Sequence, residues 1–381
     1  MSRTRNISRY LPKRERDVEC QSLTLKITRE PHLAKCINTR LRTLSKTHLV
    51  SFFTILSLNA LFSSALNDIT SAMSQQQQRK VFVANADTFE GYAIARECLT
   101  GKLRDRFDEV LCGIHKVSRS GDLIFHGGHL IQLGNDASQG DIERHLRGVD
   151  TLLLVPNPGA SDMVGNASEY LKACQHSGVK RCLLVSLIGC DDRQVRIADQ
   201  YAKCEEQLKN SGIENYAVVR LGIIQNWMFL WSPQIKEQGR LCMPMKHDVQ
   251  FAPLNVCDMA YFCSWVVSEG IRGKTEKFQL TGNELINAQV LVQRINKTVG
   301  SQHQIEYQQI EREHAKRWLQ MLLANDRLVE KCLDICELAN RGKFNMTSND
   351  EKKSGKEPIN LDQFLKDHLN QFKPRQGQMK K

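Results

Sequence analysis

The sequence predicts an α/β fold, in which a doubly wound parallel sheet is followed by a smaller, mainly helical C-terminal part. Two observations carry this prediction. From residue 80 to 221, short apolar segments alternate with segments whose apolar residues recur at helical spacing. Beyond Gly222 the alternation stops, and longer helical patterns follow an irregular stretch. Strands that alternate with helices favour parallel pairing with right-handed crossovers.

The first unit, residues 80–99 (KVFVANADTFEGYAIARECL), combines an apolar strand, a tight turn and a helix. A dinucleotide-binding βαβ unit opens in this way. The expected glycine pattern G-x-x-G-x-x-G falls on Asn85, Thr88 and Gly91, so only the third glycine is present. The other two let the backbone turn sharply and approach a pyrophosphate. The turn therefore has two interpretations: an altered cofactor site, or a helix start that Asp87 and Glu90 merely cap.

The following segments extend the sheet in chain order. Further strands are predicted at 108–114, 149–155, 179–187 and 216–221, with a hairpin or third strand at 123–125 and 130–133. Helices are predicted at 141–146, 160–177, 197–209, 255–268, 288–299, 311–338 and 361–372, with a polar loop at 346–357. We divide the chain into an N-terminal extension (1–78), a dinucleotide-binding domain (79–225) and a helix-rich C-terminal subdomain (226–381).

Charge is unevenly distributed along the chain. The formal net charge is +11, but residues 1–47 carry +8 of it, so the predicted folded part is almost balanced. Such a balance argues against a basic face for nucleic acid. The 13 cysteines are scattered, with no C-x-x-C pair and no zinc-ligand spacing. This pattern favours reduced thiols in a cytoplasmic protein.

The N-terminal extension contains an uncharged apolar run of 18 residues at 49–66, which follows the basic stretch. Three interpretations stay open. The run could anchor the protein in a membrane, although Asn59 and several Ser and Thr residues weaken it. The basic stretch could belong to a mitochondrial leader. Alternatively, translation could start at Met73, shortly before the first strand, and yield a cytoplasmic chain.

Several passages, taken in order, resemble one protein family. They are GVDTLLLVPNP, SGVKRCLLVSLIG, YAKCEEQLKNSGIENYAVVRLGIIQNW, NVCDMAYFCSWVV and SGKEPINLDQFLKDH. Together with the first unit, they resemble the NmrA-like group of atypical short-chain dehydrogenases/reductases, which have an NAD(P)-binding Rossmann fold. The resemblance extends from Lys80 to about Phe372.

The resemblance implies a cofactor cleft for NADP or NAD. The phosphates would be faced by Asn85, Thr88, Phe89, Glu90 and Gly91, the adenosine ribose by His115 and Lys116, the adenine by Asn135 and Asp136, and the nicotinamide half by Pro156 and Asn157. Lys203 aligns with the family's ribose-binding lysine. Lys116 slightly favours NADP, because a cation attracts the 2′-phosphate. Alternatively, it is an ordinary solvated lysine at a strand end.

Glu90 is the predicted obstacle to the phosphates. Two like charges about 5 Å apart, at an effective dielectric constant of about 20, repel by roughly 3 kcal/mol. Screening reduces this to on the order of 1 kcal/mol, or about fivefold in affinity. From the sequence we therefore expect Glu90→Val to tighten NADP binding.

The catalytic pattern of active reductases is broken. These enzymes use Tyr-x-x-x-Lys on one helix, with the tyrosine as proton donor. In Asp199-Gln-Tyr-Ala-Lys203 the residue four before the lysine is an aspartate, and Tyr201 points to another helix face. Ser186 has the position of a catalytic serine, but a strand-end serine more often satisfies local backbone groups. We therefore assign no catalytic residue and no metal ligand.

Three functions are compatible with a retained fold and a broken catalytic centre. The first is a redox-sensing regulator or binding protein that binds a dinucleotide and a protein partner. The second is an NADPH-dependent oxidoreductase of quinone or enone type, because a quinone product needs little help from a general acid. In that case Trp227 to Trp231, with Met243 and Met245, could form the pocket floor, or else pack in the core. The third is a pseudoenzyme that binds no cofactor.

Overall fold

The structure is a computed structural model that describes residues 79–117, 120–134, 137–269, 271, 276–300 and 304–374. The basic stretch and the apolar run of the predicted extension 1–78 lie outside the described residues. Within the described part of the chain, no helix combines the length and the apolar character needed to cross a membrane. The eleven cysteines of this part are all free thiols, and only Cys257 among them is exposed.

Seven parallel strands form the central sheet, in the order β3-β2-β1-β4-β5-β6-β8. Their bounds are β1 (Lys80–Ala84), β2 (Glu109–Ile114), β3 (His129–Gln132), β4 (Thr151–Leu154), β5 (Arg181–Leu187), β6 (Asn215–Leu221) and β8 (Glu276–Leu280). All of β4 is buried, as is β1 after its first residue, which explains the continuous apolar runs in the sequence. The strand order reverses between β1 and β4 and confirms the predicted doubly wound sheet.

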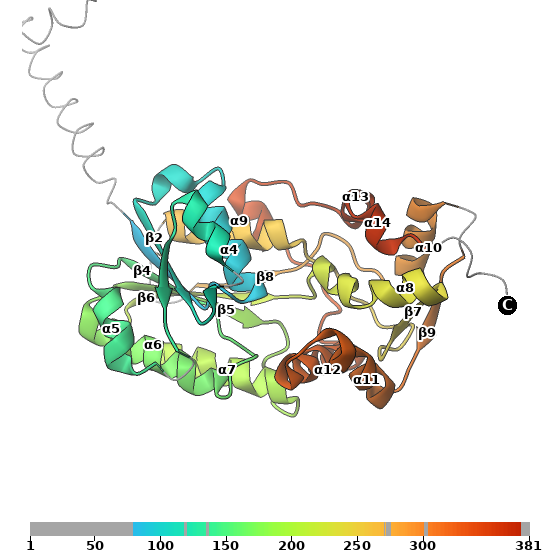
Figure 1. The fold of residues 1–381 in the computed structure, drawn as a ribbon, viewed down its shortest axis with the longest axis horizontal. Helices are drawn as coiled ribbons and strands as arrows, with labels where there is room; N and C mark the ends of the chain where they lie inside the picture. Colours follow the sequence, from blue (N-terminus) through green and yellow to red (C-terminus); the bar gives the residue numbers. More distant parts are fainter. Residues whose placement is uncertain are drawn as a thin grey trace, which may run out of the picture. The chain divides into compact units, whose positions relative to one another are not determined.

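Helices cover both faces of the sheet (Figure 1). On one face, α4 (Phe89–Thr100) packs against α9 (Val256–Glu269); the other face is covered by α5 (Gln139–Leu146), α6 (Met163–Ser177) and α7 (Arg196–Lys209). Each face has its own core. Val81 and Val83 belong to the core under α4, whereas Phe82 and Ala84 belong to the core under α6. This division follows from the alternation of side chains along a strand.

The remaining C-terminal elements form a lobe beside the sheet (Figure 1). They are η4 (Gln225–Leu230), α8 (Ser232–Gln238), β7 (Arg240–Met243), α10 (Ala288–Val299), β9 (Glu306–Gln309), α11 (Arg312–Leu322), α12 (Asp326–Asn340), α13 (Leu361–Asp367) and α14 (Leu369–Phe372). In this lobe β7 and β9 pair in parallel. Two elements from this half of the chain, α9 and β8, return to the central sheet.

Four local predictions need correction. Residues 361–372 form two short helices, α13 and α14, rather than one. Residues 123–125 belong to the 3₁₀ turn η3 (Gly121–His126) rather than to a strand. Residues 311–338 form two helices, because the Asn325 side chain accepts the first N–H groups of α12 and starts a new helix there. The predicted loop at 346–357 contains the short 3₁₀ turn η5 (Asp350–Ser354).

We expect Gly91→Ala to destabilise the fold. A Cβ at Gly91 would clash with the backbone carbonyl oxygen of Asn85, which cannot move aside without deforming the turn. Overpacking of this kind costs about 1–3 kcal/mol in the free energy of unfolding, measurable by urea titration. Gly140→Ala is the matched control, because Gly140 lies exposed in α5 with nothing closer than 3.9 Å, and alanine there should stabilise the helix slightly. Equal stability of Gly91→Ala and the wild type would contradict the prediction.

Candidate functional site

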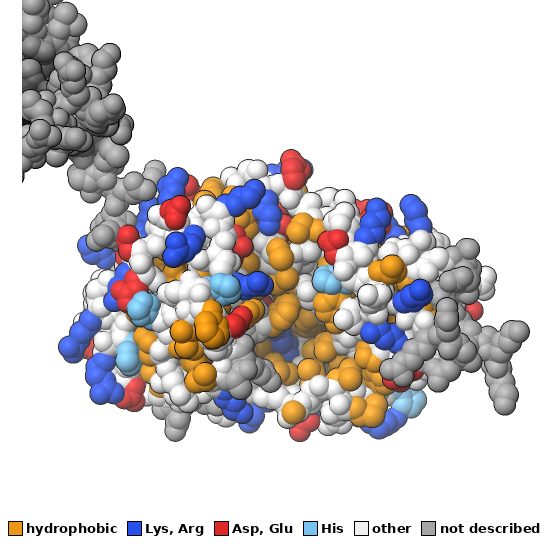
Figure 2. Space-filling view, turned by 45° about the horizontal axis from the view of Figure 1, so that its top comes forward, with side chains coloured by type: hydrophobic (Ala, Val, Ile, Leu, Met, Phe, Trp, Pro, Cys, Tyr) orange, Lys and Arg blue, Asp and Glu red, His pale blue; other side chains and the backbone are white. Residues whose placement is uncertain are grey.

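A cleft of about 410 Å³ opens where the carboxyl ends of β1 and β2 face the loop after β4 and the start of α12. Figure 2 shows a hollow on this side of the molecule, with hydrophobic side chains along its borders. The cleft is lined by Asp87, Thr88, Phe89, Glu90, His115, Lys116, Asn157, Pro158, Gly159, Asn226, Trp227, Leu230, Leu323, Asn325, Leu328, Lys331 and Cys332. It lies at the point where the strand order reverses, which is where open α/β sheets bind ligands.

Asn85 shapes the turn after β1. It is the one non-glycine residue with a positive φ (56°) among the described residues, and asparagine tolerates this left-handed conformation. Its side-chain Nδ2 donates to the Val155 carbonyl oxygen at 2.6 Å and to Asn166 Oδ1 at 3.4 Å. The asparagine thus replaces the missing glycine and ties the turn to the end of β4. Its side chain is buried behind the cleft and does not line it.

Thr88 caps α4. Its Oγ1 accepts the Gly91 N–H at 3.1 Å and donates to the Asn85 carbonyl oxygen at 2.8 Å. The interpretation that Asp87 caps this helix, with Glu90 completing the pair, is therefore wrong. Because Thr88 takes that role, both carboxylates are free for other partners.

Asp87 joins the turn to the end of β2. Its Oδ2 accepts the backbone N–H groups of His115 and Lys116, both at 3.0 Å, and its Oδ1 lies 3.0 Å from His115 Nδ1. Burial raises the pKa of this carboxyl, but the hydrogen bonds and the charge of His115 outweigh burial, so the pKa lies below its usual value. An ionised Asp87 therefore fixes His115 and Lys116 at the rim of the cleft.

Glu90 has a partner that the sequence analysis missed. Lys331 of α12 donates to Glu90 Oε1 at 2.8 Å, and the side chains of Lys331 and Glu90 are only 10% and 14% exposed. Burial raises the pKa of Glu90, but the charge and the hydrogen bond of Lys331 outweigh it and hold the pKa below its usual value. Burial lowers the pKa of Lys331, and the attraction of Glu90 outweighs this and raises it. The picture of Glu90 as an uncompensated charge is thus corrected, because the pair is neutral overall.

The opposite wall of the cleft is mostly apolar, with Trp227, Leu230, Leu323 and Leu328 among its residues. Asparagines interrupt this surface. Asn157 Oδ1 accepts the Gly159 N–H at 2.9 Å, and Asn325 Nδ2 donates to the Gly159 carbonyl oxygen at 3.0 Å. Asn226 Oδ1 is buried and has no hydrogen-bond partner among the described residues. This oxygen can accept a hydrogen bond from a ligand.

The structure brings only part of the predicted site residues to the cleft. Its lining includes Thr88, Phe89, Glu90, His115, Lys116 and Asn157, whereas Asn85, Gly91 and Pro156 do not line it. Asn135 and Asp136 lie outside the described residues. Trp227 lines the cleft, but Trp231, Met243 and Met245 pack in the core. The predicted pocket floor therefore shrinks to Trp227 and its neighbours.

Lys203 does not reach the cleft. Its Nζ lies 2.7 Å from Asp199 Oδ2, its side chain is half exposed, and it lines a separate groove between α6 and α7. On the same helix Tyr201 is buried, and burial raises its pKa to about 12, while Lys331 lowers that pKa and Glu90 raises it. Tyr201 therefore lies near the ion pair at the cleft, and the predicted role of Lys203 in cofactor binding is not supported by its position.

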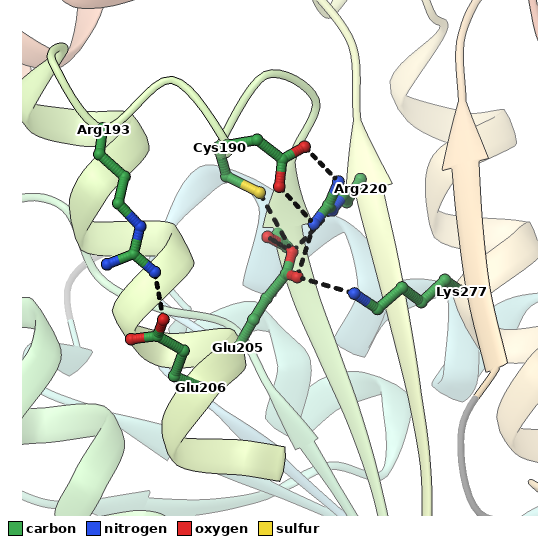
Figure 3. Close-up of polar contacts among 8 residues, drawn as sticks. Cys190, Arg193, Glu205, Glu206, Arg220 and Lys277 are labelled. Carbon is green, nitrogen blue, oxygen red and sulfur yellow. Dashed lines mark hydrogen bonds and ion pairs between the residues drawn. The ribbon is translucent and has the colours of Figure 1, made fainter.

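Ser186 contacts a largely buried ionic cluster around Glu205 and Arg220, which Figure 3 shows. Its Oγ donates to Glu205 Oε1 at 2.6 Å, and the two Glu205 oxygens also accept from Arg220, each at 2.8 Å. Cys190 Sγ lies 3.3 Å from the same carboxylate, and Lys277 Nζ lies 3.5 Å from it. Burial raises the pKa of Glu205, but Arg220 and Ser186 outweigh it and lower that pKa. The Ser186 hydroxyl is thus committed to joining β5, α7 and β6.

Comparison with known proteins gives one partial match in sequence. No protein-family model matches the chain. Over 166 residues the chain is 26% identical to quinone oxidoreductase 2 of Escherichia coli. The matched segment covers 43% of this chain and 56% of that protein. The chain thus matches about half the length of this curated relative.

Solved structures are similar over much more of the chain. NADPH-dependent quinone oxidoreductase QOR2 of Escherichia coli, complexed with NADPH, has a TM-score of 0.66 at 21% identity and covers 76% of this chain and 99% of its own. Triphenylmethane reductase of Citrobacter sp., complexed with NADP(H), has a TM-score of 0.65 at 16% identity with the same coverage. NmrA, a negative transcriptional regulator in complex with NADP, has a TM-score of 0.61 at 11% identity, covering 76% and 95%. These likenesses confirm the predicted Rossmann fold.

We expect Lys331→Met to destabilise the protein by about 3–5 kcal/mol at pH 7, because it leaves the Glu90 carboxylate buried without a cation. The loss should shrink as the pH falls. In the wild type, the pKa of Glu90 is lower in the folded protein than in the unfolded chain. Glu90 therefore adds stability at pH values above its unfolded pKa, and this stability is lost as the pH falls through its folded pKa. In the variant, burial alone raises that pKa, so protonation relieves the penalty.

Urea unfolding between pH 7 and pH 4 checks this prediction. The double variant Glu90→Gln/Lys331→Met should recover most of the loss, since neither buried charge remains. Lys316→Met is the matched control, because Lys316 pairs with Glu330 at the same 2.8 Å but in a more exposed position, and it should change stability little. If the loss of unfolding free energy in Lys331→Met is the same at pH 7 and pH 4, the unpaired Glu90 carboxylate is not its cause.

Proposed function

We propose that this protein binds NAD(P) in the cleft and acts as a redox-sensing regulator or binding protein of the NmrA type, with a protein partner, rather than as a tyrosine-dependent reductase. The observation that carries the proposal is the composition of the cleft. The turn after β1 lines the cleft at the point where the strand order reverses. In contrast, Lys203 of α7 lines a separate groove and not the cleft.

The cleft and the turn behind it fit a dinucleotide in three respects. Asn85 provides the left-handed turn without a glycine. The charge of Glu90 is balanced by Lys331, so the first turn of α4 carries no net negative charge toward a phosphate. At the apolar wall, Asn226 offers a buried acceptor without a partner among the described residues. Thr88 at the start of α4 would face the phosphates, His115 and Lys116 the adenosine ribose, and Asn157 and Asn226 the nicotinamide half.

Among the described residues, no tyrosine lines the cleft to act as the proton donor of a Tyr-x-x-x-Lys reductase. A bound dinucleotide supplies a hydride, but a carbonyl oxygen must also receive a proton. Tyr201 is buried, does not line the cleft, and has a pKa raised to about 12 by burial. Asp199 is ion-paired with Lys203 away from the cleft. Binding without carbonyl reduction is the function that this arrangement supports best.

We expect saturable binding of both NADP⁺ and NAD⁺ to the full chain in calorimetric titrations. Lys116→Ala should weaken NADP⁺ binding about two- to fivefold and leave NAD⁺ binding unchanged, because an exposed lysine contributes modestly to a phosphate contact. Lys102→Ala is the control, since Lys102 is also exposed but does not line the cleft. If the wild type binds neither dinucleotide, the pseudoenzyme without cofactor is the better description.

A second candidate function is the reduction of a quinone or enone with NADPH. It is favoured by the apolar wall around Trp227, Leu230 and Leu328 and by the likeness to quinone oxidoreductase 2. A quinone product ionises easily and needs no general acid in the cleft.

Steady-state oxidation of NADPH with a panel of small quinones separates the two candidates. We expect no quinone-dependent oxidation above the background rate. If the wild type oxidises NADPH with a quinone and Tyr201→Phe is equally active, the quinone-reductase hypothesis replaces the regulator hypothesis. Hydride transfer that does not need the Tyr201 phenol would then explain the activity. Turnover that Tyr201→Phe abolishes would show that the phenol donates the proton, and would contradict the assignment of no catalytic residue.

A further inference from the structure

We infer that Lys331 is the phosphate-binding residue of the cleft, and that Glu90 holds its ammonium group until the pyrophosphate of a dinucleotide takes over. This inference rests on the proposed dinucleotide binding. It goes beyond that proposal by assigning the residue that compensates for the two glycines missing from the turn.

Lys331 reaches the place where a phosphate is expected. Its Nζ lies 2.8 Å from a carboxylate oxygen of Glu90, which sits in the first turn of α4. The N-terminus of a helix attracts anions through its free N–H groups and its dipole. The Glu90 carboxylate is the anion that now lies there, and Lys331 is its cation.

The other basic groups of the cleft are placed differently. The His115 ring lies against Asp87 at the end of β2, and Lys116 is exposed at the rim. Lys331 is only 8% exposed as a residue. A phosphate that contacts Lys331 therefore meets its charge largely out of water, where a charged hydrogen bond is stronger than at the surface.

Helix α12 holds Lys331 rigidly over the cleft. At its start, Asn325 donates to the Gly159 carbonyl oxygen across the cleft at 3.0 Å. About one turn after Lys331, Asp334 forms ion pairs with Arg196 of α7 at 3.1 Å and with Arg312 of α11 at 3.0 Å. The ammonium position is thus set before a ligand arrives, which reduces the entropy lost on binding.

A buried ammonium group requires an anion at all times. Glu90 supplies the anion in the free protein, and the pyrophosphate supplies it in the complex, so the two compete for one cation. Removing Glu90 should therefore tighten dinucleotide binding, whereas removing Lys331 should weaken it. If the pair only stabilised the fold, removing Glu90 and removing Lys331 would both weaken dinucleotide binding.

Calorimetric titration of the full chain tests these opposite signs. The ligands are NADP⁺, NAD⁺ and ADP, which contain a pyrophosphate, and adenosine, which does not. The variants are Glu90→Gln, Lys331→Met, Lys331→Arg and the double variant Glu90→Gln/Lys331→Met, with Lys316→Met as the control outside the cleft. Thermal melting of each variant confirms that the titrated sample is folded.

We expect Lys331→Met to weaken binding of the three pyrophosphate ligands about tenfold or more, and Glu90→Gln to tighten it several-fold. Lys331→Arg should retain binding within about threefold, because it keeps the cation. Adenosine binding should change in none of the variants, and Lys316→Met should behave as the wild type. If Glu90→Gln does not fold, the double variant, which lacks both charges of the Glu90–Lys331 pair, should still bind at least about tenfold more weakly than the wild type.

Two results would overturn the assignment of Lys331. One is wild-type affinity in Lys331→Met or in the double variant. The other is equal weakening by Glu90→Gln and Lys331→Met, with recovery in the double variant. Failure of the wild type to bind NADP⁺, NAD⁺ or ADP would instead overturn the proposed function, and the assignment with it.

Discussion

The close approach of Gly91 to the Asn85 carbonyl oxygen is the constraint on which the cleft depends. It allows α4 to start directly after β1, so that the helix N-terminus faces the reversal point of the sheet. Asn85 adopts the left-handed conformation that the turn requires, and its buried amide bonds hold the turn against the end of β4. The strand–turn–helix geometry is thus kept without two of the expected glycines, because Asn85 adopts the left-handed conformation and Gly91 allows the close approach.

The charge introduced at this turn is balanced from the other end of the chain. Glu90 and Asp87 place two carboxylates beside the helix start, where open sheets of this type bind anionic cofactors. Asp87 is committed to the amides at the end of β2, and Glu90 to Lys331. Because breaking one partner of a buried pair is costly, the pair also stabilises the position of α12 against α4. The candidate site and the packing of the C-terminal lobe therefore depend on the same ion pair.

The position of α7 argues against a tyrosine-dependent reductase. A helix residue contributes to a site only when its face points there. On α7 the inward face carries Tyr201 and the outward face carries Lys203, so the helix cannot present a tyrosine and a lysine together. Ser186, which resembles a catalytic serine in the sequence, is drawn into the cluster of Glu205 and Arg220 instead. The proposed function of binding without carbonyl reduction follows from these placements.

The sequence by itself determined the sheet, its flanking helices and the position of the phosphate turn. These features depend on local periodicity, and each strand and helix buries a continuous apolar run or face that can be recognised within a few residues. The break between α11 and α12 was missed, although Asn325 is a possible helix cap, because the apolar pattern continues across it.

Only the tertiary structure decided which charges meet. Lys331 and Glu90 are 241 residues apart, and nothing near Lys331 in the sequence separates it from a solvated helix lysine. The direction in which Lys203 points likewise depends on the rotation of α7 about its axis, and a short motif does not define this rotation. Long-range electrostatic pairs depend on the three-dimensional packing of several elements, whereas periodicity is a property of each element alone. For this reason the fold could be predicted from the sequence, while the charge balance of the cleft could not.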